Sequence, residues 1–418
     1  MSDAGRWCLP DPARKAHWIA MSSNSYGDGS TRGFDKVPPD IYQPDPELAG
    51  YPPPQPPIGP LGYGQAGPGQ PYGRFGPYGS PAYPPPVPVS TSALPQVPRV
   101  YQQMLRGPQY RWWKPLLCLV LVLPLALIMM GLAVVPVLIA GLINGAPDLV
   151  EYTVRTTSDI DNLGPIGFLY LNLTLIVLIP ASGLSIWIVH GIRPGFLSSV
   201  AGRIRWRWLL RCVAVILPLW AVYTLLGVMV TPFTSPRPDH WVALLVLVLL
   251  MTPLQAAGEE YFFRGWIMQN VGAWFARPMV GLVVSIAVSA VVFSALHLSP
   301  DPWVLGSIAC LAVASGLAAW RTGGLEAGIA MHAVNNMLAL SILVIFGGWS
   351  QAFIRTDTTG SPMMLLLAIA VNGIALGLIF WQAKRAGLQP YYDPAARPMG
   401  PTSVPPAPAY PLSQYPAP

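Results

Sequence analysis

Residues 258–264 read GEEYFFR and follow an apolar run that extends from Trp241 to Met251. The stretch places two adjacent carboxylates and a guanidinium beside a segment suited to a membrane. A charged group costs about 2.5–3.5 kcal/mol at the centre of a transmembrane helix on insertion scales, so such groups need polar partners or a function. The stretch therefore indicates a polar site built into a membrane domain.

Helix geometry separates the two acids of this stretch. Residues four apart share a helix face, so Glu260 and Arg264 are expected to form an ion pair in the favoured order, acid first. Glu259 is turned by about 100° from Glu260 at 3.6 residues per turn and lacks that partner. Glu259 is therefore the freer carboxylate and the better candidate for proton chemistry.

Two later apolar segments carry the other strongly polar groups of this kind in the C-terminal half. One holds Phe293 and His297, four residues apart, so that the phenyl ring can cover the imidazole. The other holds His332 and Asn336, which have the same spacing and project side by side. We expect these segments and the one with Glu259 to form the walls of a single site.

Composition sets the class of protein. Hydrophobic residues make up 53% of the 418 residues and charged residues only 10%, against about 25% charged in a typical soluble domain. We therefore expect an all-α, polytopic bundle of membrane helices. The formal charge is +6, but no dense basic run is present, so nucleic acid is not an expected partner. The cysteines have neither metal-type nor redox-type spacing and indicate no disulfide framework.

Apolar segments near the ~20 residues that a bilayer core demands can be placed eight times. The expected spans are 115–143, 165–189, 209–230, 241–258, 279–298, 303–320, 325–346 and 362–382. Prolines inside these spans are expected to kink the helices rather than break them, because neighbouring helices re-satisfy the freed backbone groups. The prolines concerned are Pro124, Pro136, Pro218 and Pro253.

Lysine and arginine flank these spans unevenly. Thirteen lie at one set of helix ends, and only Arg155, Arg237 and Arg355 lie at the other. By the positive-inside rule both termini are then cytoplasmic, and the chain is expected in the cell membrane, in contact with lipid. The basic, aromatic stretch 193–211 either lies on the inner leaflet against anionic lipid or is a loop that follows the same rule.

Proline marks the two ends of the chain. Residues 1–110 hold 23 of the 49 prolines, and residues 390–418 hold 10. We expect disordered, polyproline-rich tails at 1–105 and 390–418 around a membrane domain at 106–389. Proteins with grooves for proline motifs are candidate partners of the tails. Met21 opens a run better matched to the tail than residues 1–20, and is a candidate start.

Three motifs occur in order on successive apolar segments: EExxxR at 259–264, FxxxH at 293–297 and HxxxN at 332–336. Together they resemble the CPBP family of intramembrane proteases. That family includes the type II CAAX prenyl endopeptidases and bacterial proteins associated with bacteriocin processing and self-immunity. The resemblance covers roughly residues 240–345.

The resemblance implies hydrolysis of a peptide bond in a membrane-associated protein or peptide. Glu259 and His297 would activate a water, with Glu259 as the general base. His332 and Asn336 would donate hydrogen bonds to the oxyanion. The remaining motif residues would support these groups: Glu260, Arg264 and Phe293.

A zinc site is the alternative for the same residues. One carboxylate and two histidines, Glu259, His297 and His332, form an acceptable catalytic zinc set. The helical HExxH arrangement is absent, and Asn336 suits oxyanion binding better than zinc ligation, so the metal-free glutamate mechanism is favoured. A rival of another class is a non-catalytic membrane scaffold or bacteriocin-immunity factor, in which the same groups line a binding pocket.

The depths of the two histidines leave one question open. At 1.5 Å per residue, His297 lies about 27 Å along a span that starts near Met279, and His332 lies only about 10 Å into its own span. Straight helices with these ends cannot hold both at one depth. Either the helix with Glu259 continues to about Arg277 inside the membrane, or the stretch after Arg277 begins as an interfacial turn.

Overall fold

The structure is a computed structural model that describes residues 92–230 and 236–396. Most of each expected tail, with Cys8 and the candidate start at Met21, lies outside the described residues.

The described part of the chain is almost entirely helical, and the expected all-α fold is confirmed. The elements in order are β1 (Arg99–Val100), η3 (Tyr101–Gln103), α2 (Lys114–Leu132), α3 (Val135–Ile143), α4 (Leu149–Ser158), α5 (Pro165–Ile176), α6 (Leu178–His190), α7 (Gly195–Ser198), α8 (Trp206–Val230), α9 (Trp241–Glu260), η4 (Tyr261–Ile267), α10 (Met268–Ala273), α11 (Pro278–Ala295), α12 (Pro302–Thr322), α13 (Glu326–Phe346), η5 (Trp349–Gln351), α14 (Pro362–Arg385) and β2 (Tyr391–Tyr392). The element η4 is a π-helix, whereas η3 and η5 are 3₁₀-helices.

The expected membrane spans are also confirmed. The described residues contain 8 helical spans that are long and apolar enough to cross a membrane. The fourth span, Trp241–Ala273, is 33 residues long because the helix continues from α9 through η4 into α10. The helix that carries Glu259 therefore runs beyond the expected end at residue 258 to Ala273, so that Glu259 lies in its interior rather than near its end.

One of the four prolines interrupts its span. Pro136 has no N–H to donate to the carbonyl of Leu132, and α2 ends at Leu132 before α3 begins at Val135. The regular helix is thus interrupted for two residues at this position, while the membrane span as a whole still runs from Lys114 to Ile143. The other three lie inside continuous helices, as expected: Pro124, Pro218 and Pro253.

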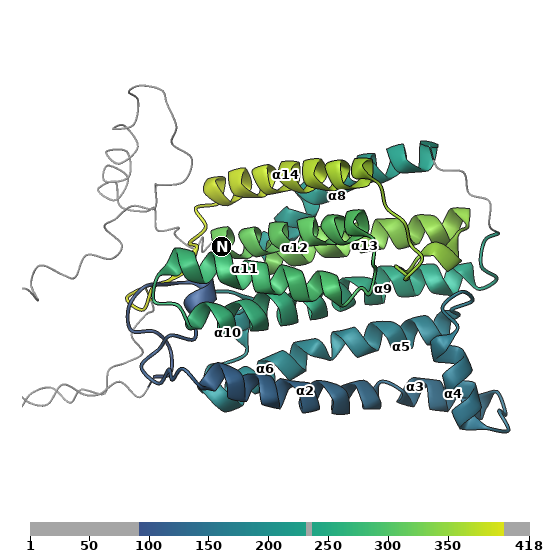
Figure 1. The fold of residues 1–418 in the computed structure, drawn as a ribbon, viewed down its shortest axis with the longest axis horizontal. Helices are drawn as coiled ribbons and strands as arrows, with labels where there is room; N and C mark the ends of the chain where they lie inside the picture. The colour runs from purple at the N-terminus through teal and green to yellow at the C-terminus, as the bar shows by residue number, and fades with distance from the viewer. Residues whose placement is uncertain (1–91, 231–235, 397–418) are drawn as a thin grey trace, which may run out of the picture. The chain divides into compact units, whose positions relative to one another are not determined.

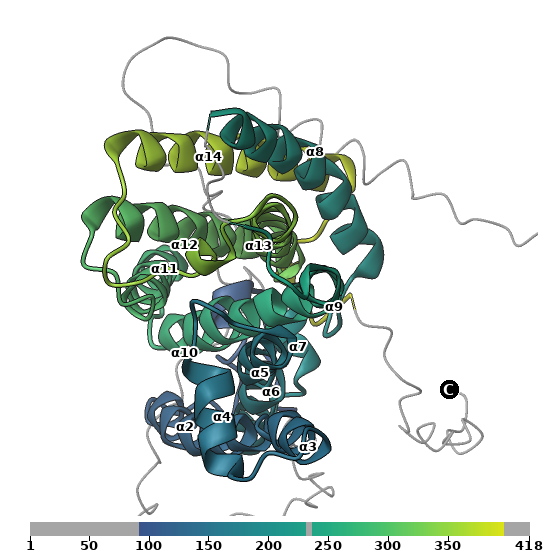
Figure 2. The same ribbon diagram turned by 90° about the vertical axis from the view of Figure 1, so that its right-hand side faces the viewer.

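The helix that carries the two acids lies in the interior of the bundle. Figures 1 and 2 show α8 and α14 on one side of the described helices and α2 and α3 on the other. Between them, α13 packs against α8 and α9, and α9 packs against α5. Gly258 permits this last contact, because a Cβ there would lie 2.1 Å from the carbonyl oxygen of Leu175. Any larger residue at 258 would push α9 away from α5.

The inner ends of both expected tails are folded. Strand β1 pairs antiparallel with β2, so that Arg99 lies opposite Tyr392. The side chains of Tyr101 and Leu105 are buried, and the Tyr101 hydroxyl donates to the carbonyl of Leu197. The tail boundaries expected at 105 and 390 therefore fall inside or beside ordered chain. Composition did not reveal these ordered ends, because they are held by a few large side chains that pack against residues distant in the sequence.

Part of the basic stretch 193–211 packs into the protein instead of lying on a surface. Phe196 and Leu197 are buried, and the N–H of Leu325 donates to the carbonyl of Ser198 at 2.9 Å. Only the far end of the stretch has the exposed aromatic character expected of an interfacial segment, with the Trp206 side chain exposed. The first half of the stretch thus braces the start of α13.

Candidate active site

The acids and one histidine of the motifs meet where α9 contacts α13. Glu259 and Glu260 are the last two residues of α9, and His332 is buried in α13. The π-helix η4 begins at the next residue, Tyr261. Such π-helical turns are rare and frequently occur at functional sites, because they change the direction of the side chains that follow.

The expected ion pair between Glu260 and Arg264 is confirmed. Arg264 Nη1 lies 3.0 Å from Glu260 Oε1, and both side chains are completely buried. The guanidinium carbon lies 4.3 Å from the centre of the Phe293 ring, and Nε donates to the carbonyl of Ala312 at 3.4 Å. Arg264 is therefore an internal counter-charge for Glu260 and not a cation at a membrane surface.

His332 lies between the two acids. Its Nδ1 is 3.0 Å from Glu260 Oε1 and its Nε2 is 3.2 Å from Glu259 Oε2. An ionised carboxylate only accepts hydrogen bonds, and a neutral imidazole donates through one nitrogen only. The contact with Glu260 is a hydrogen bond, whereas the contact with Glu259 is a close approach that becomes an ion pair when His332 is protonated.

Glu259 has one oxygen held and one oxygen open. Its Oε2 accepts from the side-chain Nε2 of Gln255 at 2.9 Å as well as facing His332. Its Oε1 makes no hydrogen bond with any residue that the structure describes, and the side chain is 13% exposed. Sequence reasoning missed Gln255, although a polar residue four positions before Glu259 on an apolar helix was a usable signal.

His297 is close to the cluster but not in contact with Glu259 among the described contacts. It lies just beyond the end of α11, with Nδ1 2.9 Å from the carbonyl oxygen of Phe293. The Phe293 ring centre is 4.9 Å from that of His297 and 5.7 Å from that of His332. The expected cover of His297 by Phe293 is confirmed, and the two histidines flank one phenyl ring. The structure pairs Glu259 with His332, whereas the sequence analysis paired it with His297.

Asn336 belongs to a hydrogen-bonded chain that the motifs did not reveal. Its Oδ1 accepts from Asn335 Nδ2 at 3.0 Å, and Asn335 Oδ1 accepts from the indole Nε1 of Trp220 at 3.0 Å. The adjacent asparagine was visible in the sequence. Trp220 could not be assigned to the site from sequence, because it belongs to α8, a different span.

Two residues of the zinc alternative, His297 and His332, lie against one phenyl ring. The described residues contain no group of three or more His, Cys, Asp or Glu side chains that could hold a metal ion. Phe293 contacts both His297 and His332, and both ring nitrogens of His332 face carboxylates. The expected set of Glu259, His297 and His332 is therefore not assembled as three converging ligands.

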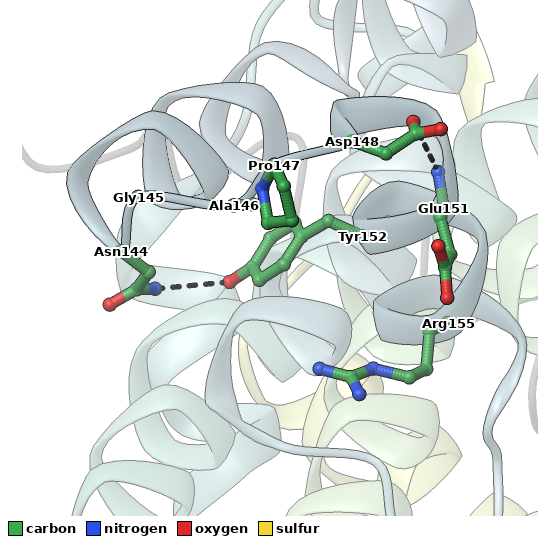
Figure 3. A pocket seen from close by; sticks show the side chains of 8 residues that line it. All are labelled: Asn144, Gly145, Ala146, Pro147, Asp148, Glu151, Tyr152 and Arg155. Carbon is green, nitrogen blue, oxygen red and sulfur yellow. Dashed lines mark hydrogen bonds between the residues drawn. The ribbon is translucent and has the colours of Figure 1, made fainter.

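Two open grooves lie away from this cluster, on the connection between the first two spans. One, of about 350 Å³, lies between Asn144 and Arg155, with Tyr152 held by Asn144 as one wall (Figure 3). The other, of about 420 Å³, includes His240. Neither groove is lined by a residue of the three motifs, so neither is a candidate for the site.

The comparisons with known proteins point to the same region. The family model described as type II CAAX prenyl endopeptidase Rce1-like matches residues 240–338. An uncharacterized protein of Bacillus subtilis (strain 168), YyaK, is 29% identical over 159 residues, which are 35% of this chain and 51% of that protein. The match thus spans about half the length of this relative. No solved structure matches the chain. The region that contains all three motifs is therefore similar to the type II CAAX prenyl endopeptidases, the kind of family that the motifs indicated.

Proposed function

We propose that this chain is an intramembrane endopeptidase that hydrolyses a peptide bond in a membrane-associated protein or peptide. The observation that carries the proposal is the state of Glu259, whose Oε2 is held by Gln255 and His332 while its Oε1 is open. A carboxylate that is fixed in place but has a free oxygen suits a general base that takes a proton from water.

In this proposal His332 is protonated in the resting state. Glu259 is then the ionised base, and the Nε2–H of His332 faces Glu259 Oε2. The charges of Glu259, Glu260, Arg264 and His332 then sum to zero, which favours this state in a buried cluster. Glu260 and Arg264 act through His332, because Glu260 holds its Nδ1.

His297 has a tautomer suited to water binding. A carbonyl oxygen only accepts hydrogen bonds, so the contact with Phe293 places the proton of a neutral His297 on Nδ1. Its Nε2 is then an acceptor, and we propose that it holds the attacking water together with Glu259. His332 and Asn336 would donate to the oxyanion of the tetrahedral intermediate.

The proposed mechanism uses no metal. We place the protein in the cell membrane with both termini cytoplasmic. Prenylated C-terminal CAAX peptides are the first substrate class to test, because the matching family is described by that name. Membrane lipid and the peptide substrate are the partners required for catalysis. The proline-rich ends would serve recruitment.

The test compares Glu259→Gln with wild type in purified full-length protein reconstituted in lipid. A farnesylated CAAX peptide, its unmodified counterpart and total membrane peptides serve as substrates. We expect cleavage by wild type and a fall of about 10²–10⁴-fold in the variant, the usual contribution of a general base. Glu151→Gln on α4, an exposed acid outside the motifs, is the matched control. Unchanged cleavage by Glu259→Gln would show that Glu259 is not the base, and absence of cleavage by wild type would leave the scaffold or immunity role as the better account.

A further inference from the structure

Two neighbouring asparagines on α13 and a tryptophan on α8 form a chain of hydrogen bonds that ends at Asn336, the last residue of the HxxxN motif. Trp220 Nε1 lies 3.0 Å from Asn335 Oδ1, and Asn335 Nδ2 lies 3.0 Å from Asn336 Oδ1. The proposed function assigns a role to Asn336 alone. Trp220 and Asn335 are outside the three motifs.

The direction of every bond in this chain is fixed by chemistry. The oxygen and nitrogen of an asparagine amide have nearly the same shape, so their assignment rests on the hydrogen-bond partners. An indole N–H is a donor only, and Asn335 must therefore present its oxygen to Trp220. Its NH₂ group then faces Asn336, which must present its own oxygen in turn. The NH₂ group of Asn336 is left as a donor on the other side of its amide.

The indole that starts the chain cannot easily turn. Trp220 is only 2% exposed and belongs to the buried cluster between α8, α13 and α14, with Ile216, Met331 and Val334. A large side chain in such close packing has few alternative rotamers. The position of the N–H is thus set by the packing of the surrounding helices, before any substrate binds.

We propose that Trp220 and Asn335 are positioning residues that orient the Asn336 amide with its NH₂ group toward the oxyanion. The inference rests on the proposed function, in which Asn336 Nδ2 is an oxyanion donor. That nitrogen makes no hydrogen bond with any residue within 92–230 and 236–396. If the amide turned over, Asn336 would present an oxygen to the developing negative charge, and a stabilising contact would become a repulsive one.

The sharpest variant is Asn335→Asp. A carboxylate at 335 still accepts from Trp220 but cannot donate to Asn336, whose amide is then expected to turn and donate to the new acid. We expect kcat to fall by about 10²-fold, as for loss of an oxyanion donor, with KM nearly unchanged. Trp220→Phe removes only the first donor and is expected to lower kcat by a smaller factor in the same direction.

Trp208→Phe is the matched control. Trp208 lies on the same helix and in the same buried cluster, is 3% exposed, and its Nε1 has no hydrogen-bond partner among the described residues. The control makes the same change of side-chain size in the same environment and leaves the hydrogen bonds from Trp220 to Asn336 in place. It is expected to keep the wild-type kcat and to unfold at the same temperature as Trp220→Phe, within a few degrees.

An activity-independent measurement separates this inference from the proposed function. In protein labelled with ¹⁵N at the indole nitrogens, the resonance missing from Trp220→Phe identifies Trp220. Loss of its acceptor in Asn335→Leu should move that resonance upfield and leave the Trp208 resonance in place. An unmoved Trp220 resonance would show that Trp220 does not donate to Asn335 and would overturn the inference, whatever the activity.

The kinetic measurements also distinguish failure of the positioning role from failure of the proposed function. Wild-type kcat in Asn335→Asp and Trp220→Phe, beside a large loss in Asn336→Leu, would overturn the positioning role. A change in KM alone in Asn335→Asp would also overturn it, because an oxyanion contact acts in the transition state. Full activity of Glu259→Gln would sink the proposed function and leave the indole shift as evidence for the hydrogen bonds only.

Discussion

Gly328 of α13 lies directly against the carboxylate of Glu260. A Cβ at position 328 would be 2.8 Å from Glu260 Oε2 and 3.2 Å from the Cβ of Ser315. The missing side chain lets α13 approach the end of α9 so closely that His332 Nδ1 reaches Glu260 at 3.0 Å. One glycine therefore sets the distance between the histidine and its buried acid.

Gly328→Ala is expected to reduce turnover strongly, because the added methyl group displaces Glu260 and with it His332. A misplacement of about 1 Å can cost 10²-fold in rate. Helix propensity would not explain such a loss, because alanine normally stabilises a helix relative to glycine by about 1 kcal/mol. Gly373→Ala on α14, where a Cβ meets nothing within 4 Å, is the control and should keep full turnover. Equal turnover of the two variants would contradict the assigned packing.

The buried ion pair between Arg205 and Glu326 is expected to matter much more than an exposed one. Arg205 Nη2 lies 2.6 Å from Glu326 Oε2, and the Glu326 side chain is completely buried. Arg205→Met leaves that charge unpaired, which costs about 3–5 kcal/mol. Thermal unfolding of the full-length protein in detergent measures the loss, and adding Glu326→Met to Arg205→Met should recover much of it.

The control for this prediction is Arg355→Met. Arg355 pairs with Asp161, and the two side chains are 40% and 55% exposed. Loss of an exposed pair costs about 0–1 kcal/mol. If both arginine variants unfold at the same temperature, burial does not govern the contribution of these pairs.

Two shortened proteins, one with ends chosen by composition and one with ends chosen by the structure, should differ in stability and turnover. A chain of residues 106–389 lacks Tyr101, Met104 and Leu105, which are 0%, 0% and 1% exposed. Each such side chain contributes about 1.5–3 kcal/mol when buried. We expect a lower unfolding temperature and weaker turnover for 106–389, and near full-length behaviour for 92–396. Matching stability of the two shortened chains would show that the segment before α2 does not brace the bundle.

Metal removal gives a fourth expectation. Treatment of the purified protein with EDTA should leave turnover unchanged, because Glu259, His297 and His332 do not converge as ligands. Elemental analysis should find less than one zinc per chain. Loss of turnover that zinc restores would show that these three side chains rearrange to bind metal and that the glutamate mechanism is wrong.

Contacts within one helix could be predicted from the sequence. The eight spans follow from runs of apolar residues, which are a local property of the chain. The pairing of Glu260 with Arg264 and the cover of His297 by Phe293 follow from a spacing of four residues. Gln255 beside Glu259 and the break at Pro136 obey equally local rules, and the same reasoning could have found them.

Contacts between helices were decided only by the tertiary structure. Glu260 and His332 are 72 residues apart, and Trp220 and Asn335 are 115 apart. No spacing rule connects such pairs, since they depend on which faces of α8, α9 and α13 pack together and on how closely Gly258 and Gly328 let the backbones approach. The sequence determined that the motif residues lie in a bundle of apolar, membrane-type helices. Packing decided that His332, rather than His297, contacts Glu259.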